Sequence, residues 1–237
     1  TTGQMRPVRI TPNYTKHAAG SVLIEFGDTK VICTVCVEEN VPSFLRHANP
    51  PQGWLTAEYN MLPSSTNTRS RRERNKVGGR TQEIQRLIGR ALRGVVDLRL
   101  CPDLTFAIDC DVIQADGGTR TTSITGAYVA LKIAVDKLIR KKRLSQSPLI
   151  ESVAAVSVGL KDGEVQVDLD YIEDSSADLD MNVVLTQDGK ILEIQGTAER
   201  AAFSKEEVMR IIEAAEESLA PIFDLQNAAA DGQMVES

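Results

Sequence analysis

Hydrophobic and β-branched residues gather in short runs along the first third of the chain, as they do in strands. The runs from Ser21 to Phe26 and from Lys30 to Val37 have this pattern, and Gly27-Asp28 between them is a hairpin signal. A shorter run, Trp54 to Tyr59, stands in a stretch rich in proline and glycine, which predicts mostly loop between residues 41 and 74. We therefore expect sheet in this part of the chain.

The next part of the chain has a helical period instead. Apolar residues recur there at spacings of three and four: Ile84, Leu87, Ile88, Ala91, Leu92 and Val95. Arg86, Arg90 and Arg93 fall on a different stripe, so one face of this helix is expected to pack and another to present guanidinium groups. A strand from Leu104 to Ile113, a glycine-rich turn and a helix to about Arg140 follow.

The second half carries two hairpin patterns and one more helix. Ser152 to Leu160 and Glu164 to Tyr171 flank one Asp-Gly turn, and Asp180 to Thr186 and Ile191 to Thr197 flank another. The last helix begins with a capping box whose first residue is Ser204.

Strands interleaved with three helices predict an α+β fold in which mixed sheets pack against helices. Because no linker separates the halves, we expect a single domain, residues 1–237, made of two closely joined lobes. These lobes span about residues 1–145 and 146–237. The tail from Asn227 onward is expected to be frayed.

Composition narrows the class of protein. The chain has 237 residues, of which 42% are hydrophobic and 25% charged, as in ordinary globular proteins. It has no run of 18 or more apolar residues and no basic-then-apolar leader, so we expect a cytoplasmic protein without a membrane partner.

Charge is strongly segregated along the chain. Residues 69–93 hold nine cations and two acidic residues, a net charge of +7, so the remainder must carry −13 of the total of −6. Four of the cations stand in a stretch without apolar periodicity and are expected on a loop: Arg69, Arg71, Arg72 and Arg74. A flexible arginine loop next to an arginine-faced helix favours binding of a polyanion such as RNA over a merely solvated surface.

Few histidines and cysteines limit the possible chemistry. Cys33 and Cys36 form a lone C-x-x-C inside a strand pattern, and an offset of three residues places them on opposite faces. We therefore expect reduced thiols rather than a zinc or redox site. His17 and His47 are the only imidazoles, so proton transfer or metal binding must fall mainly to carboxylates.

Two segments contain candidate chemistry. The turn from Gly117 to Ser123 offers backbone N–H groups, hydroxyls, one guanidinium and a helix N-terminus, which suits an oxyanion; the alternative is a turn that merely caps the helix. Asp174, Asp178 and Asp180 form the best carboxylate cluster, with Asp168 and Asp170 upstream. Asp174 and Asp180 would lie about 20 Å apart on a straight chain, so joint action requires a turn. The alternative is a solvated acidic loop.

Three blocks in a fixed order resemble a known family. They run from Gly78 to Arg90, from Asp109 to Gly126 and from Tyr171 to Asn182. Together they closely resemble bacterial ribonuclease PH, and the likeness extends over about residues 6–223. The resemblance implies a ribosomal protein S5 domain 2-like fold, shared with polynucleotide phosphorylase and the exosome ring. It leaves strand pairing at the N-terminal end open, because the leading arginine-rich residues of the family are absent.

The resemblance also implies an activity. Ribonuclease PH removes 3′-terminal nucleotides from RNA, including tRNA precursors, by reversible phosphorolysis, in which inorganic phosphate is the co-substrate and nucleoside 5′-diphosphates are the products. The implied assembly is a homohexamer, a trimer of dimers. Two other interpretations stay open: a ring subunit that binds RNA without cutting it, and a metal-dependent hydrolase.

The resemblance also assigns roles to individual residues of this chain. Phosphate binding is assigned to Arg86, Gly118, Thr119 and Arg120. Asp174 and Asp180 are assigned as ligands of Mg²⁺ or Mn²⁺. Asp174, Asp180 and Arg86 are assigned to catalysis. Asp180 is also the candidate proton donor to the leaving 3′ oxygen. Like charges repel when phosphate approaches a phosphodiester, so the cations would serve to neutralise that approach.

Overall fold

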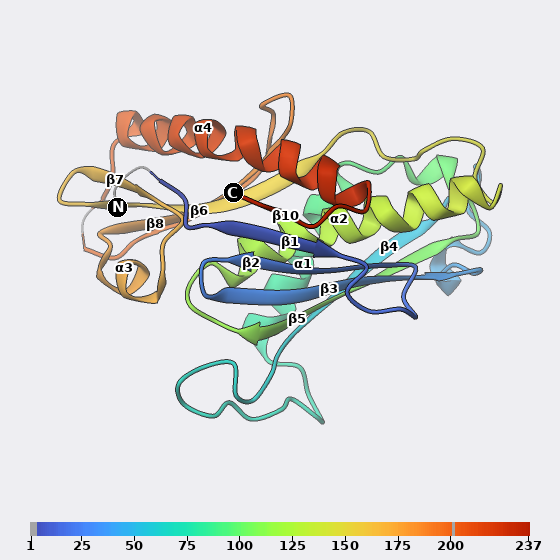
Figure 1. Cartoon of the computed structure of the whole chain (residues 1–237), viewed down its shortest axis with the longest axis horizontal. Coiled ribbons are helices and arrows are strands. Elements are labelled where there is room, and N and C mark those ends of the chain that lie inside the picture. The colour runs from blue at the N-terminus through green and yellow to red at the C-terminus, as the bar shows by residue number, and fades with distance from the viewer. Residues whose placement is uncertain (1–3, 201) are drawn as a thin grey trace.

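The computed structural model describes residues 4–200 and 202–237 and contains two sheets (Figure 1). The first sheet has the strand order β10-β1-β2-β3-β5-β4. Its strands are β1 (Val8–Pro12), β2 (Gly20–Phe26), β3 (Thr29–Glu38), β4 (Trp54–Met61), β5 (Thr105–Gln114) and β10 (Val235–Glu236). β4 and β5 pair in parallel and the other neighbours are antiparallel, so this sheet is mixed.

The second sheet is antiparallel throughout, with the strand order β7-β6-β8-β9. Its strands are β6 (Val153–Lys161), β7 (Glu164–Val167), β8 (Leu179–Thr186) and β9 (Ile191–Ala198). Both predicted Asp-Gly hairpins are confirmed, as β6 pairs with β7 and β8 with β9. β7 ends at Val167 rather than Tyr171, because Asp168 has a positive φ of 57° and Asp170 caps a helix.

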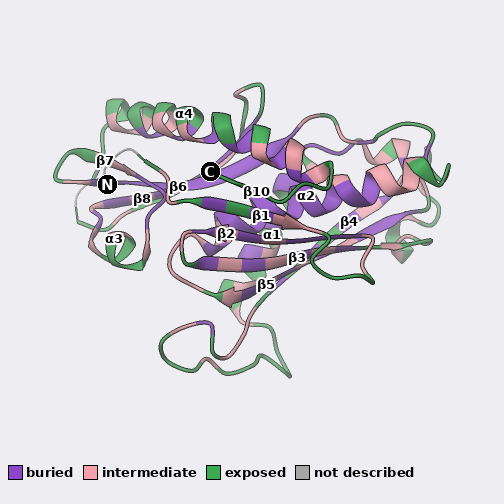
Figure 2. Cartoon of the chain, in the orientation of Figure 1, coloured by how far each residue is buried: buried purple, intermediate pink, exposed green. Residues whose placement is uncertain are grey.

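Four α-helices accompany the sheets: α1 (Gly79–Arg93), α2 (Thr119–Arg140), α3 (Tyr171–Ser176) and α4 (Lys205–Ala230). Short 3₁₀ turns occur at Ser43–Leu45 and Leu98–Leu100. α2 contacts β2 and β3 of the first sheet and β6 of the second, and residues 121–131 are all buried (Figure 2). α2 therefore lies in the core, and the buried hydroxyls of its first turns, Thr122, Ser123 and Thr125, donate to backbone carbonyls four residues earlier. The predicted α+β class is confirmed.

The two chain ends differ from expectation. α4 continues to Ala230, where Ala229 is fully buried, and after the turn at Gly232 the chain forms β10. β10 pairs with β1, and β1 pairs with β2, which resolves the open question of N-terminal pairing. The prediction of a frayed tail is wrong, because it overlooked the run of helix-forming alanines and the apolar Val235.

The exposure of the cysteines agrees with the expected strand faces. Cys33 is buried and Cys36 is exposed, and all four cysteines are free thiols. No helix in the described part of the chain is long and apolar enough to cross a membrane.

Candidate active site

A cleft of about 880 Å³ lies between the two sheets at the N-terminal end of α2. The loop from β5 into α2 and the start of α1 form one wall, and residues from α3, β8 and β9 form the other. The polar residues that line it are Thr66, Arg80, Glu83, Thr119, Arg120, Ser157, Tyr171, Asp174, Asp180, Asn182, Gln195, Thr197 and Glu199. The structure therefore brings the predicted glycine turn and the predicted carboxylates, far apart in sequence, into one cavity.

The glycine turn has a backbone conformation that requires glycine. Gly117 and Gly118 have φ angles of 81° and 71°, and a Cβ on Gly117 would lie 2.4 Å from the carbonyl oxygen of Leu169. Gly118 is the N-cap of α2, and its carbonyl accepts from the Thr122 N–H. The first N–H groups of a helix have no intrahelical acceptor, so those of α2 are available to an anion in the cleft.

The next two residues, Thr119 and Arg120, are held by partners from other elements. The Thr119 hydroxyl lies 2.9 Å from the Tyr59 hydroxyl, and both residues are buried. Arg120 Nη1 donates to Glu83 on α1, 3.0 Å from Oε2, and Gln195 of β9 donates to Oε1 of the same carboxylate at 3.3 Å. Glu83 thus links α1, α2 and the second sheet beside the turn.

The lining of the cleft differs at one position from the phosphate ligands that the resemblance implies. Arg86 does not line the cleft, whereas Arg80 does. On a helix six residues correspond to a rotation of about 240°, so the two side chains leave α1 in different directions. Arg90 and Arg93, on the Arg86 stripe, serve the fold: Arg90 pairs with Glu193 at 3.0 Å, and Arg93 donates to the Leu55 carbonyl and lies over Trp54.

The carboxylate pair depends on a short helix that the sequence analysis does not predict. Asp174 lies on α3 and Asp180 on β8, and the reversal between them brings the two side chains within hydrogen-bonding reach. Burial, the hydrogen bond to Asp174 and the negative charge of Asp174 raise the pKa of Asp180 to about 8, while Arg120 opposes the shift. Asp180 Oδ1 is also buried, and it has no hydrogen-bond partner among the residues that the structure describes. Buried polar atoms are normally paired, so this oxygen is suited to bind a proton or a cation.

These two carboxylates suit a metal ion that takes its remaining ligands from water and substrate. Among the described residues no group of three or more His, Cys, Asp or Glu side chains is arranged to hold a metal ion. Mg²⁺, however, is commonly held by one or two carboxylates together with waters and substrate phosphates. The upstream aspartates have other roles: Asp168 pairs with Arg6, Asp170 caps α3, and Asp178 pairs with Arg200.

The loop arginines extend from the cleft rather than line it. Arg69, Arg71, Arg72 and Arg74 are exposed on the loop between β4 and α1, as predicted. Figure 1 shows this loop projecting from the body of the molecule below β5. Thr66 near its start and Arg80 just after its end both line the cleft, so the loop is attached to the cleft at both ends.

Sequence reasoning missed several residues of the cleft, among them Glu83, Ser157 and Gln195. The first lies one turn after Arg80 on α1, and helical spacing alone marks it as a neighbour. The other two come from β6 and β9 and carry no local signal, because only the sheet order places them here. α3 did have a signal, the capping box formed by Asp170 and Glu173.

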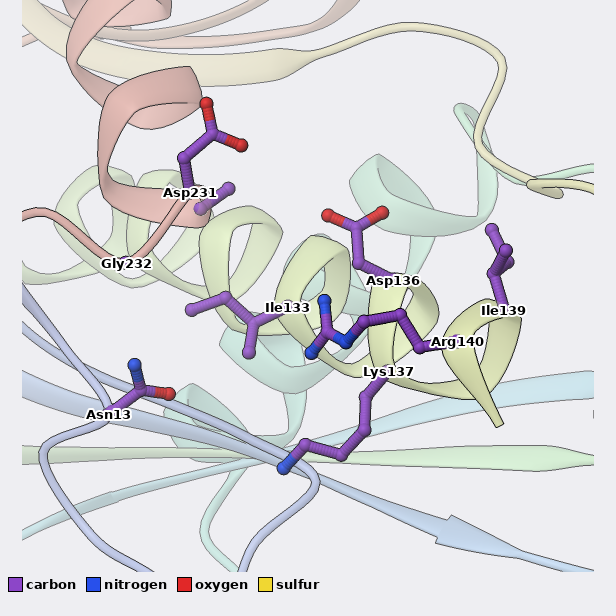
Figure 3. A pocket seen from close by; sticks show the side chains of 9 residues that line it. Asn13, Ile133, Asp136, Lys137, Ile139, Arg140, Asp231 and Gly232 are labelled. Carbon is purple, nitrogen blue, oxygen red and sulfur yellow. The ribbon is translucent and has the colours of Figure 1, made fainter. Parts of the chain in front are cut away.

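A second hollow lies at the opposite end of α2 (Figure 3). It measures about 470 Å³, and its lining includes Asp136, Lys137, Arg140 and Asp231 near the C-terminal ends of α2 and α4. Helix C-termini carry partial negative charge and attract cations. The lysine and arginine here therefore complement the dipole of their own helix, and they lie beside two carboxylates, Asp136 and Asp231.

Known structures share the fold of the whole chain. A rice (Oryza sativa) Rrp46 structure superposes with a TM-score of 0.78 at 20% identity, covering 97% of each chain. The Archaeoglobus fulgidus exosome with RNA bound to the active site gives 0.78 at 19% identity, covering 94% of this chain and 89% of that one. An archaeal exosome core gives 0.74 at 18% identity, with 95% and 88% covered.

The family assignment comes from the sequence and covers both sheets. Residues 4–135 match the first domain of the 3′ exoribonuclease family, and residues 151–218 match the second domain. The first match holds the turn that ends in Arg120, and the second holds Asp174 and Asp180. The two walls of the cleft thus lie in the two matched domains, and the chain belongs to the 3′ exoribonuclease family.

Proposed function

We propose that this protein is a phosphate-dependent 3′-to-5′ exoribonuclease, which removes terminal nucleotides of RNA as nucleoside 5′-diphosphates. One observation carries the proposal: the glycine turn at the N-terminus of α2 and the Asp174–Asp180 pair, in which the pKa of Asp180 is raised, line the same cleft. A hydrolase needs only the carboxylates, because water requires no cationic cradle. A subunit that merely binds RNA needs neither a buried carboxyl with a raised pKa nor an orphaned oxygen.

The reaction joins orthophosphate to the 5′-phosphate of the last nucleotide. A phosphate oxygen attacks that phosphorus, the bond to the 3′ oxygen of the preceding ribose breaks, and the 3′ oxygen takes up a proton. Both reactants are anions, so the protein must neutralise their approach and hold the attacking and leaving oxygens in line. The N–H groups of Gly118 and Thr119, with Arg120 and Arg80, would hold the attacking phosphate, since all four residues line the cleft.

Asp174 and Asp180 would hold Mg²⁺ or Mn²⁺ beside the scissile phosphate. A divalent ion there supplies charge that stabilises the phosphoryl oxygens. Asp180 is also the candidate proton donor, since a pKa of about 8 keeps its carboxyl protonated at neutral pH in the metal-free protein. One carboxyl cannot be an ionised ligand and a proton donor at the same moment, so the pH profile with and without Mg²⁺ separates the two roles.

RNA would enter along the arginine loop. Arg69, Arg71, Arg72 and Arg74 provide an electrostatic surface that is continuous with the cleft through Thr66 and Arg80. Precursors of tRNA, a cytoplasmic location and a hexameric ring belong to the same proposal. The size of one copy supports assembly into a ring, because a chain of 25.9 kDa is too small to enclose an RNA channel by itself.

The proposal is tested by supplying and withholding phosphate. A single-stranded RNA with a labelled 3′ end is incubated with the protein and Mg²⁺, and the released nucleotides are separated. We expect nucleoside diphosphates in proportion to added phosphate and no degradation without it. Nucleoside monophosphates released without phosphate would identify a hydrolase, and RNA binding without any release would identify a non-cutting subunit.

A further inference from the structure

An ion pair between Arg6 and Asp168 lies directly behind the glycine turn. Arg6 precedes β1 and Asp168 follows β7, so the pair joins residues 162 positions apart. Arg6 Nε and Nη2 donate to the two carboxylate oxygens at 2.9 and 2.8 Å, and the Arg6 backbone N–H donates to Oδ2 at 3.0 Å. The side chains are only 16% and 0% exposed. Neither residue lines the cleft.

The remaining donors of Arg6 hold the carbonyl groups of the turn. Nη1 donates to the Asp116 carbonyl at 2.6 Å, and Nη2 donates to the Gly117 carbonyl at 3.2 Å. The buried Thr29 hydroxyl donates to the same Gly117 carbonyl at 2.6 Å and accepts from the Asp116 N–H at 3.0 Å. Two successive carbonyls of the turn are therefore fixed on the Arg6 side.

Fixing these carbonyls also fixes the N–H groups that face the cleft. In a planar trans peptide the carbonyl and the N–H point in opposite directions. The Gly117 carbonyl shares its peptide group with the Gly118 N–H, so holding the oxygen toward Arg6 aims that N–H away from Arg6. Gly118 lines the cleft, and this N–H is one of the proposed phosphate donors.

The other end of the pair is attached to the second sheet. The Asp168 N–H donates to the Ser157 carbonyl on β6 at 2.6 Å, and the Leu169 N–H donates to the Ser157 hydroxyl at 3.0 Å. Asp168 keeps a left-handed φ of 57°, a conformation that a non-glycine residue retains only where its surroundings enforce it. The ion pair thus fixes the position of the glycine turn relative to the second sheet, which carries Asp180.

From these contacts we propose that Arg6 and Asp168 are positioning residues for the phosphate site: they hold the turn so that its N–H groups converge on phosphate, without touching it. This inference rests on the proposed function and deepens it. It predicts that loss of the pair weakens phosphate binding selectively, whereas a merely structural pair would change stability and leave the phosphate affinity of the folded protein unchanged.

The test compares variants that disturb the same turn in different ways. Asp168→Asn keeps the shape of the side chain and tolerates a positive φ, but removes the charge. Arg6→Lys keeps a charge but loses the planar fork that reaches both the carboxylate and the carbonyls. Thr29→Val keeps the volume and removes only the hydroxyl that donates to Gly117. Arg9→Gln is the matched control, because Arg9 lies on β1 close to Arg6 and its exposed ion pair is with Glu236 of β10.

Two measurements are made on each variant that folds at the assay temperature, as judged by its melting curve. Calorimetry measures binding of inorganic phosphate without RNA, and steady-state kinetics measures KM for phosphate, KM for RNA and kcat. For Asp168→Asn and Arg6→Lys we expect about tenfold weaker phosphate binding and higher phosphate KM, the loss typical of one charge-assisted hydrogen bond. Thr29→Val should also weaken phosphate binding and raise the phosphate KM, but by less. The KM for RNA should stay within about twofold of wild type in every variant, and so should all values measured for Arg9→Gln.

The outcomes separate this inference from the proposed function. If the wild-type protein binds phosphate but releases no diphosphates, the proposed function fails, and the calorimetric comparison still tests the positioning role. Folded variants with wild-type phosphate affinity and a lower melting temperature would overturn the inference. If Asp168→Asn does not fold, Arg6→Lys and Thr29→Val decide, and unchanged phosphate affinity in both contradicts it.

Discussion

The two walls of the cleft satisfy their polar groups in opposite ways. On the turn wall, the Thr119 hydroxyl is paired with Tyr59, Arg120 is paired with Glu83, and the turn carbonyls are held from behind by Arg6. On the carboxylate wall, Asp180 Oδ1 is buried without a partner in residues 4–200 and 202–237, and burial beside Asp174 raises the pKa of its carboxyl. The difference indicates that donors for an anion are fixed in advance, whereas the carboxylates are stabilised only when a proton or a cation arrives.

The carboxylate wall should be the easier of the two to disable. Asp180→Asn removes a proposed metal ligand and the candidate acid together, and we expect kcat to fall at least about 100-fold, the lower end of the range for acid–base groups. Asp178→Asn is the matched control, because Asp178 pairs with Arg200 and does not line the cleft. Single-turnover assays at saturating phosphate measure both. Equal activities of the two variants would remove Asp180 from the reaction.

The turn wall should respond through phosphate. Arg120→Ala removes a charge-assisted hydrogen bond worth about 1.5–3 kcal/mol, which corresponds to about a 10- to 100-fold loss of kcat/KM for phosphate. Arg143→Ala, which breaks an ion pair with Glu39 outside the cleft, serves as the control. An Arg120 variant with wild-type phosphate dependence would contradict the cationic role of this wall.

A comparison within α1 sharpens the boundary of the turn wall. Because Arg80 lines the cleft and Arg86 does not, Arg80→Ala should lose about tenfold in phosphate kcat/KM and Arg86→Ala less than about twofold. Both variants remove one exposed arginine from the same helix, so their effects on net charge are equal. The reverse order of effects would support the assignment of Arg86 to phosphate that the resemblance implies.

The stability of the metal-free protein should also distinguish the walls. The pKa of Asp180 is about 8 in the folded protein against an ordinary 3.8, so between these values the folded state binds more protons than the unfolded state. The carboxylate wall therefore lowers stability as pH rises through this window. Asp180→Asn should raise the free energy of unfolding at pH 8 by more than about 1.4 kcal/mol, the equivalent of one pKa unit, and by much less near pH 4.

Urea unfolding at several pH values in the presence of a chelator measures this effect. Mg²⁺ should then stabilise the wild-type protein and leave Asp180→Asn nearly unchanged. An Asp180→Asn variant no more stable than wild type at pH 8 would show that the ionised Asp180 carboxylate does not lower the free energy of unfolding.

The smallest effect is expected from the arginine loop, which belongs to neither wall. Replacing Arg69 or Arg71 by alanine should flatten the salt dependence of RNA binding by about 0.7 in log K per log salt for each RNA phosphate that the protein no longer neutralises. Phosphate KM should not change. Fluorescence anisotropy with a labelled single strand at several salt concentrations measures the slope, and an unaltered slope would assign these arginines to solvation.

Much of the fold could be predicted, because it is encoded in local periodicity. Both Asp-Gly hairpins, the helix from Gly79 and the buried helix after Gly118 follow from spacing and turn residues alone. The errors occurred where short segments depend on tertiary partners. β10 has two residues and exists only because β1 lies beside it, and α3 has six residues, stabilised by its capping box.

The candidate site was only partly accessible to sequence reasoning. The turn and the aspartates are visible as residue types, but their meeting depends on how the two sheets enclose α2. The motif that suggests Arg86 also contains Arg80, and only side-chain direction on α1 distinguishes them. Arg6 has no local signal at all, because its partner is 162 positions away.

Isotopic labelling tests the central claim most directly. The reaction is run with ¹⁸O-labelled orthophosphate in ordinary water, and the released nucleotides are analysed by mass spectrometry. If the turn wall delivers phosphate to the scissile bond, the label appears in the terminal phosphate of nucleoside diphosphates. Unlabelled nucleoside monophosphates as the only product would mean that water is the nucleophile and would contradict the proposed function.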